Sequence, residues 1–117
     1  MNEETEKKLN FYPYYARLLS SRRKTTTIRL GNQTGRFSNG DVVRITVGWN
    51  VESNSEIAKA RITHIETKRV IEINRDDLEG ESPDCRNKGA IIYVLSAIYR
   101  RIVSDNDTVT IVKWEYL

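Results

Sequence analysis

The sequence predicts a small α+β domain in which a mixed or closed sheet is flanked by two helices. Segments rich in β-branched residues outnumber those with helical periodicity, and most of them lie close together along the chain. One helical segment precedes these strands and the other lies before the last strand, so the order is helix, several strands, helix, strand. Because 117 residues is the usual size of one domain, these elements must share one compact arrangement.

The first part of the chain predicts a helix followed by a strand. We expect residues 1–8, which are charged and polar, to form a disordered tail ahead of a single domain at residues 9–117. From Phe11 to Ser21 apolar side chains recur at intervals of three and four residues, which predicts a short amphipathic helix with Pro13 in its first turn. Thr25–Leu30 is rich in β-branched residues and predicts a strand.

The middle of the chain predicts further strands joined by polar loops. Glycine and polar residues at 31–40 predict a loop, which leads into a strand at Asp41–Val47. Trp49–Ser55 is expected to be a connection. The long, β-branched segment Ile57–Ile73 predicts either one bent strand or two strands.

The C-terminal part predicts a helix and a closing strand. Asn74–Ser82 is expected to be an acidic connection, after which a helix begins at Pro83 with the preceding serine as its N-cap. Apolar residues at helical spacing between Ile91 and Ile102 extend this helix. Thr108–Leu117 has apolar residues on both faces of an alternating pattern, which predicts a buried strand.

Composition limits the function. The chain has one cysteine, Cys85, and one histidine, His64, so we expect no internal disulfide, no metal site and no cofactor. It has no apolar run of about 18 residues and no secretory signal pattern, so we expect no membrane contact and a cytoplasmic location. The formal charge is +3.

Basic residues gather in one part of the chain, which suits a partner that carries phosphate. Within it, strand alternation would put Thr25, Thr27 and Arg29 on one face, and Lys24 could reach over that face. A cation, a hydroxyl and a guanidinium would then converge on a spot able to hold an anion or polarise a carbonyl. The basic block consists of Arg22, Arg23, Lys24, Arg29, Arg36 and Arg44.

The stretch from Leu18 to Arg29 resembles the signature of the ASCH domain family, a helix end followed by Gly-x-Lys-x-x-Thr-x-Arg. The string Lys-Thr-Thr-Thr-Ile-Arg at 24–29 is most similar to that of the small bacterial N4-acetylcytidine amidohydrolases. The resemblance implies a PUA-like β-barrel of about five to six strands flanked by two helices. Further similar segments follow in the family's order at Phe37–Val43, Ala60–Ile65, Glu79–Ser82, Ile98–Tyr99 and Trp114–Leu117.

Two departures from the family pattern bear on the site. Arg22 stands where the signature has glycine, and two outcomes are open: arginine takes the same left-handed conformation at a cost of roughly 1 kcal/mol, or it shifts the position of Lys24. The segment between Glu79 and the last helix is longer than in the small amidohydrolases. The resemblance makes Glu79 the first choice for the site acid. Because of the added length, Glu81 and Asp84 remain alternatives.

The resemblance implies that a lysine, a threonine and a glutamate act together on an amide. Thr27 would attack the carbonyl, Lys24 would be its base and Glu79 the acid at the leaving nitrogen. Arg29 would hold a phosphate, a ribose or the oxyanion, and Arg23 would add to substrate binding. Trp49 could stack on a base or cover the barrel end.

Two functions remain open at this stage. The first is an amidohydrolase acting on an acylated cytidine, which would bind RNA or a modified nucleoside. The alternative is a non-catalytic RNA-binding module, which the basic block and the PUA-like resemblance both favour. Ribonuclease activity, also attached to the family, is less favoured because the chain lacks a pair of histidines. The sequence predicts no oligomeric state.

Overall fold

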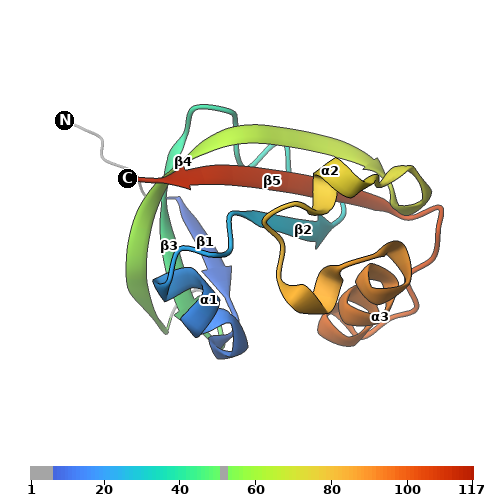
Figure 1. Ribbon diagram of the computed structural model, residues 1–117, viewed down its shortest axis with the longest axis horizontal. Coiled ribbons are helices and arrows are strands. Elements are labelled where there is room, and N and C mark those ends of the chain that lie inside the picture. Colours follow the sequence, from blue (N-terminus) through green and yellow to red (C-terminus); the bar gives the residue numbers. More distant parts are fainter. Residues whose placement is uncertain (1–6, 51–52) are drawn as a thin grey trace.

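A computed structural model describes residues 7–50 and 53–117, apart from the side chain of Asp84. Within this part of the chain, five strands form one curled sheet in the order β1-β3-β4-β5-β2 (Figure 1). A curled sheet with short helices is the predicted α+β, barrel-like fold. The strands are β1 Lys8–Phe11, β2 Thr26–Leu30, β3 Val42–Gly48, β4 Asn54–Arg69 and β5 Thr108–Tyr116.

The curl of the sheet comes from β4, which is 16 residues long. Its first half pairs with β3 and its second half pairs with β5, and the pairing register shifts between Ile62 and His64. Such a bulge bends a strand and increases its twist. The long segment that the sequence left as one bent strand or two is therefore one bent strand, and it begins at Asn54, inside the connection predicted at Trp49–Ser55.

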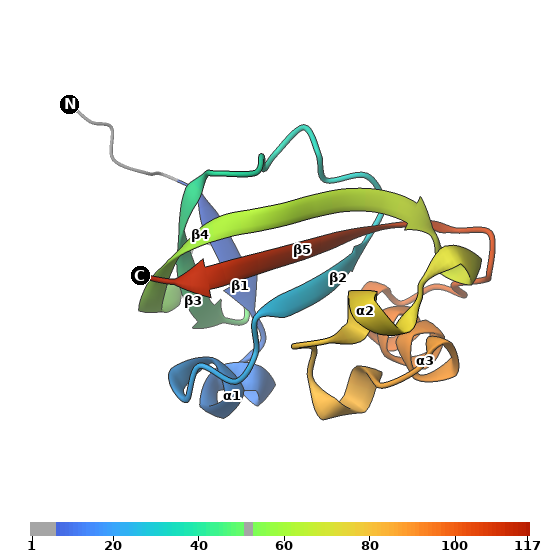
Figure 2. The same ribbon diagram turned by 45° about the horizontal axis from the view of Figure 1, so that its top comes forward.

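Helices cover the concave side of this sheet. Figures 1 and 2 show α1 and α3 on the same side, near opposite ends of β2. In the described residues, no helix is long and apolar enough to cross a membrane. The α-helices are α1 Ala16–Ser20, α2 Arg75–Leu78 and α3 Lys88–Tyr99, and the short 3-10 turns are η1 Pro13–Tyr15, η2 Val70–Glu72 and η3 Pro83–Cys85.

The N-terminal helix predicted at Phe11–Ser21 is too long, because its first residue belongs to a strand. Lys8–Phe11 pairs in parallel with β3, and its Leu9 and Phe11 point into the core with a period of two. The helical turns start only at Pro13. Of the tail predicted at residues 1–8, residues 1–6 lie outside the described part, and Lys8 is the first residue of β1.

The second helix begins later than predicted and is preceded by a helix that the sequence analysis missed. Pro83 starts the 3-10 turn η3, and α3 begins after Asn87, whose side chain accepts a hydrogen bond from the Ala90 amide. α2 lies in the predicted acidic connection, where Asn74 and Asp77 cap each other's backbone. Ile102, predicted as helical, follows the end of α3 and is 87% exposed.

The core is divided into two clusters. The first lies inside the curl of the sheet, and the second lies between β2, β5 and α3. The first consists of Leu9, Phe11, Tyr15, Leu19, Phe37, Val43, Ile45, Ala58, Ala60, Ile62, Val112 and Trp114. The second consists of Ile28, Val70, Ile73, Cys85, Ile91, Leu95, Val103, Val109 and Ile111. β5 contributes to both clusters, which explains why it is buried on both faces as predicted.

Arg22 follows α1 in a left-handed conformation with a φ of 66°, the first of the two outcomes that the sequence left open. The turn lets the amides of Arg23 and Lys24 bond back to the Leu18 carbonyl. The Arg22 guanidinium lies 4.9 Å from the centroid of the Tyr116 ring. The Tyr116 hydroxyl in turn donates to the Lys24 carbonyl. Arg22 thus adopts the left-handed conformation expected of the glycine, and Lys24 lines the cavity.

We predict that Arg22→Gly is more stable than Arg22→Ala by about 1 kcal/mol, because alanine keeps the cost of the left-handed backbone while both variants lose the contact with Tyr116. Urea unfolding of the two variants measures this difference. At neighbouring Arg23, which is exposed and has no positive φ, the same pair should rank the other way, with alanine more stable by roughly 0.5–1 kcal/mol. If the same variant, glycine or alanine, were the more stable one at both positions, the left-handed turn at Arg22 would be contradicted.

Candidate functional site

A cavity of about 320 Å³ lies between the two core clusters. One wall comes from the first cluster and η1, the other from α3, and the floor from β2. This volume is at the lower end of the range for small-molecule sites. The wall formed by α3 is almost entirely apolar, whereas the polar groups lie on the floor and beside it. The lining residues are Asn10, Phe11, Tyr12, Tyr15, Lys24, Thr27, Ile28, Arg29, Glu81, Cys85, Ile91, Val94, Leu95, Ile98 and Tyr99.

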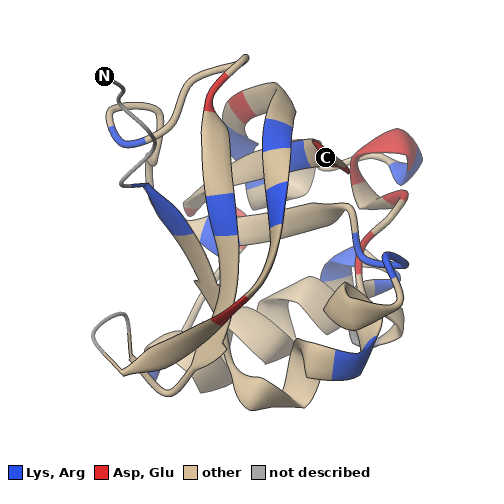
Figure 3. Cartoon of the chain, turned by 90° about the vertical axis from the view of Figure 1, so that its left-hand side faces the viewer, with Lys and Arg blue, Asp and Glu red and all other residues tan. Residues whose placement is uncertain are grey.

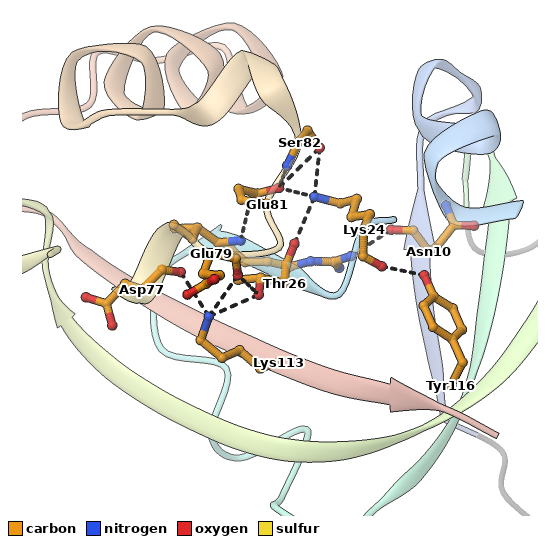
Figure 4. Close-up of polar contacts among 11 residues, drawn as sticks. Asn10, Lys24, Thr26, Asp77, Glu79, Glu81, Ser82, Lys113 and Tyr116 are labelled. Atoms are coloured by element: carbon orange, nitrogen blue, oxygen red, sulfur yellow. Dashed lines mark hydrogen bonds and ion pairs between the residues drawn. The ribbon is translucent and has the colours of Figure 1, made fainter. Parts of the chain in front are cut away.

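Lys24 is held inside the protein by three hydrogen bonds. Its side chain is 3% exposed, and Nζ donates to the Thr26 carbonyl and to Ser82 Oγ at 2.9 Å each. The third bond is an ion pair with Glu81 Oε1 (Figure 4). Three acceptors match the three N–H groups of an ammonium. The ring centroid of Tyr15 lies 5.1 Å from Nζ and adds a cation–π contact.

Glu81 is anchored as completely as Lys24. Its carboxylate is 4% exposed, and Oε2 accepts from the Ile28 amide of β2 at 3.1 Å. Oε1 accepts from the Ser82 amide at 2.6 Å in addition to Lys24. β2 is an edge strand, so its outer amides need partners, and Glu81 provides one of them. The carboxylate therefore has a fixed position at the floor of the cavity.

Gly80 brings this carboxylate to β2. Its carbonyl accepts from the amides of Thr25 and Thr26, so the chain runs directly along the strand edge. Its φ is +87°, and a Cβ there would lie 2.2 Å from Thr25 Oγ1 and 3.0 Å from Thr26 Oγ1. Lys113 of β5 holds the same segment by donating to the carbonyls of Asp76, Asp77 and Glu79 (Figure 4). Burial lowers the pKa of Lys113.

Thr27 and Arg29 supply the groups that a ligand could use. Thr27 is 6% exposed and lines the cavity, and no hydrogen bond of its hydroxyl is found among the described residues. Arg29 donates one hydrogen bond, from Nη2 to the Asn10 carbonyl at 2.9 Å, and stacks 4.9 Å from the Phe11 centroid. Burial lowers the pKa of Arg29, against the field of Glu81. Its other N–H groups are available to an acceptor in the cavity.

The structure brings together three of the site residues that the sequence singled out, Lys24, Thr27 and Arg29. Thr25 does not join them, because it precedes β2 and its hydroxyl faces Gly80. Arg23 is exposed and lies outside the cavity lining. The basic block is not one surface, since its members spread over the cavity, the end of α1 and the outside of β3.

Glu81 is the glutamate that lines the cavity and pairs with Lys24, whereas Glu79, the first choice from the sequence, does not line it. The Glu79 side chain is exposed and lines a hollow on the other side of the segment, while its carbonyl accepts from Thr26 Oγ1. The turn at Gly80 separates the two glutamates, so that only the second faces Lys24. The Asp84 side chain lies outside what the structure describes.

Two residues that line the cavity were not assigned to the site from the sequence. Cys85, which is only 6% exposed, lines the wall next to the polar floor. Tyr12 lines the cavity and is also 5.6 Å, centroid to centroid, from Trp49, which itself lies outside the lining. A strand that ends at Phe11 would have indicated where Tyr12 points. In the described residues, no group of three His, Cys, Asp or Glu side chains could hold a metal ion.

The fold is similar to several solved structures, one of which is an ASCH domain. The ASCH domain from Lactobacillus crispatus JV V101 superposes with a TM-score of 0.66 over 94% of this chain and 79% of that one, at 10% identity. A protein from Enterococcus faecalis V583 of family model DUF984 gives 0.61 over 89% and 70%, at 16% identity. The hypothetical protein PH0355 gives 0.62 over 94% and 97%, at 13% identity.

No family model matches this chain, and no curated protein matches it in sequence. At such low identities, the structural likeness concerns the fold. The chain has the fold of an ASCH domain, as the resemblance of its Lys24–Arg29 string implies.

We predict that Gly80→Ala lowers the free energy of unfolding by about 1–3 kcal/mol more than Gly40→Ala does. Both glycines have positive φ, so both substitutions incur the backbone cost, but only the Cβ at Gly80 meets other atoms. Gly40 has open space within 4 Å and is the matched control. Chemical unfolding measures both values, and equal losses would contradict the close approach of Gly80 to β2.

Proposed function

We propose that this chain, which has the ASCH fold, binds a modified nucleoside in the cavity and hydrolyses its exocyclic amide, as in N4-acetylcytidine. One observation carries the proposal. Thr27, a residue that is only 6% exposed, lines the same cavity as the buried Lys24–Glu81 pair and brings a hydroxyl to it. A nucleophile beside an acid–base pair in a mostly apolar cavity is the arrangement that amide hydrolysis through an ester intermediate needs.

The proposed steps use the pair as a proton relay. The Lys24 ammonium gives a proton to Glu81, and the neutral amine takes the proton of the Thr27 hydroxyl. Thr27 Oγ1 forms a bond to the acetyl carbonyl carbon. As the bond from that carbon to the exocyclic nitrogen breaks, Glu81 gives its proton to the nitrogen. That transfer restores the Lys24–Glu81 ion pair. Water then hydrolyses the threonyl ester: its oxygen bonds to the acetyl carbon as the bond to Thr27 Oγ1 breaks, one proton returns to Oγ1, and the product leaves as acetate and a proton.

The other lining residues would position the substrate. The N–H groups of Arg29 that face the cavity would donate to an oxygen of the base or to the developing oxyanion, and Arg29 stays protonated throughout. The apolar wall of α3, with Val94, Leu95 and Ile98, would lie against the face of the base. This wall also keeps water away from the ion pair, which strengthens its electrostatic effect.

We predict that Thr27→Val abolishes deacetylation of N4-acetylcytidine while changing the free energy of unfolding by less than about 1 kcal/mol. Valine has a similar shape, and the Thr27 hydroxyl makes no protein hydrogen bond that the change would break. The measurement is chromatography of released cytidine, together with urea unfolding. Thr27→Ser, which keeps a hydroxyl, should retain activity. Full activity of Thr27→Val would rule out the nucleophile.

Lys24→Ala is a poorer first test. It would leave the Glu81 carboxylate buried without its cation, and removing one partner of a buried pair typically costs about 3–5 kcal/mol. Loss of activity in that variant would then reflect unfolding as well as chemistry.

A separate observation supports the alternative, a non-catalytic RNA-binding module. Lys8, Arg44 and Lys59 stand in register across β1, β3 and β4 and form what we term the basic row. Their neighbours along each strand are core residues, so the basic row lies on the outer face of the sheet, where Figure 3 shows Lys and Arg on adjacent strands. Like charges on opposing residues disfavour pairing unless an anion lies over them.

One acid reduces this charge. Glu56 of β4 lies 3.5 Å from Arg44. Lys8 and Lys59 make no ion pair within the described residues, so they are the members that would contact RNA phosphates.

If the protein binds RNA through the basic row, Lys59→Gln should weaken binding to single-stranded RNA and reduce the salt slope of log K by roughly 0.7, the value for one phosphate contact. Fluorescence anisotropy at several salt concentrations measures both. Arg75→Gln removes the same charge from α2 and should change neither. Equal effects of the two changes would indicate nonspecific attraction.

A further inference from the structure

Two exposed aromatic rings adjoin the cavity. Tyr12 is 37% exposed and lines the cavity, and Trp49 is 74% exposed beside it. The ring centroids are 5.6 Å apart with an interplanar angle of 42°. A tryptophan that is three-quarters exposed keeps most of its apolar surface in water, which is unfavourable unless another molecule covers it.

The topology explains why these two rings meet. β1 and β3 are parallel neighbours, and the last paired residues are Phe11 and Val47. Tyr12 directly follows the first, and Trp49 comes two residues after the second. Because parallel strands end on the same edge of a sheet, both rings emerge together where the chain leaves the sheet. The pair is therefore placed by the sheet itself, at a fixed position relative to the cavity.

We propose that Tyr12 and Trp49 stack the base that neighbours the one in the cavity, so that the substrate is a modified residue within single-stranded RNA. This inference rests on the proposed function. Base stacking on aromatic side chains tolerates any sequence, because every base has a π-face. One base would enter the cavity against Phe11 and Arg29, and the next would remain outside on the exposed face of Trp49.

Charge favours RNA over an apolar protein partner. β1 and β3, the strands that carry the two aromatic residues, also carry Lys8 and Arg44 of the basic row, and the chain has a formal charge of +3. Exposed Trp and Tyr are also typical of protein interfaces. If Trp49 were part of a protein interface, its substitution would not change the affinity for a nucleoside or an RNA, and the experiment that follows distinguishes the two kinds of partner.

The test compares two ligands by calorimetry: N4-acetylcytidine and an RNA trinucleotide with N4-acetylcytidine in the middle. Both are measured in the Thr27→Val background, so that neither is consumed. We expect the trinucleotide to bind more tightly, and Trp49→Ala to weaken trinucleotide binding about tenfold while changing nucleoside binding less than twofold. Trp49→Phe, which keeps a ring, should recover part of the loss.

Tyr14→Ala is the matched control. Tyr14 is 73% exposed and follows Tyr12 by two residues, but it does not line the cavity. It should change neither affinity.

Each other outcome overturns part of the argument. If Trp49→Ala weakens both ligands equally or neither, or if the trinucleotide does not bind, the stacking proposal fails. If Trp49→Ala instead abolishes self-association in sedimentation, the aromatic pair is a protein contact. If the trinucleotide binds through Trp49 as tightly as the same trinucleotide with unmodified cytidine, and the protein with Thr27 intact deacetylates neither N4-acetylcytidine nor the trinucleotide, stacking is supported and the proposed amide hydrolysis fails.

Discussion

The buried ion pair between Lys24 and Glu81 is the interaction on which the site depends. It joins the turn before β2 to the segment before α3, and these two segments border the cavity. Burying two charges costs nearly as much as their attraction returns, so the pair adds little net stability. Its effect is on position, because once both charges are buried no arrangement that separates them is tolerable. The pair therefore fixes how α3 and the sheet face each other across the cavity.

Two backbone features bring Lys24 and Glu81 together. The left-handed Arg22 turns the chain so that Lys24 points inward, and Gly80 lets the opposing segment lie against the edge of β2. Lys113 then holds the end of α2 through carbonyl oxygens, which sets the start of the segment that contains Glu81. Each feature alone is ordinary. Together they place a carboxylate, an ammonium and a hydroxyl around one small volume.

Sequence patterns predicted the elements with local signals, and they failed where tertiary contacts decide. Strand alternation is a local property, and it predicted that Thr27 and Arg29 share a face; both line the cavity, with Lys24 reaching in from the turn before β2. The choice between Glu79 and Glu81 depends on the contact of Gly80 with β2, which is distant in sequence. β1 was missed because four residues beside a helical pattern carry little signal, and only pairing with β3 makes them a strand.

The charges around the cavity indicate what it can accept. In the described lining, Lys24, Arg29 and Glu81 are the charged residues, and the first and last neutralise each other. One positive group, Arg29, remains. A triphosphate would bury several negative charges against that single cation, at a high desolvation cost. A nucleoside with at most one adjacent phosphate matches the charge, the apolar wall of α3 and the volume at once. Phosphates of a longer strand would lie outside, where solvent and surface cations accommodate them.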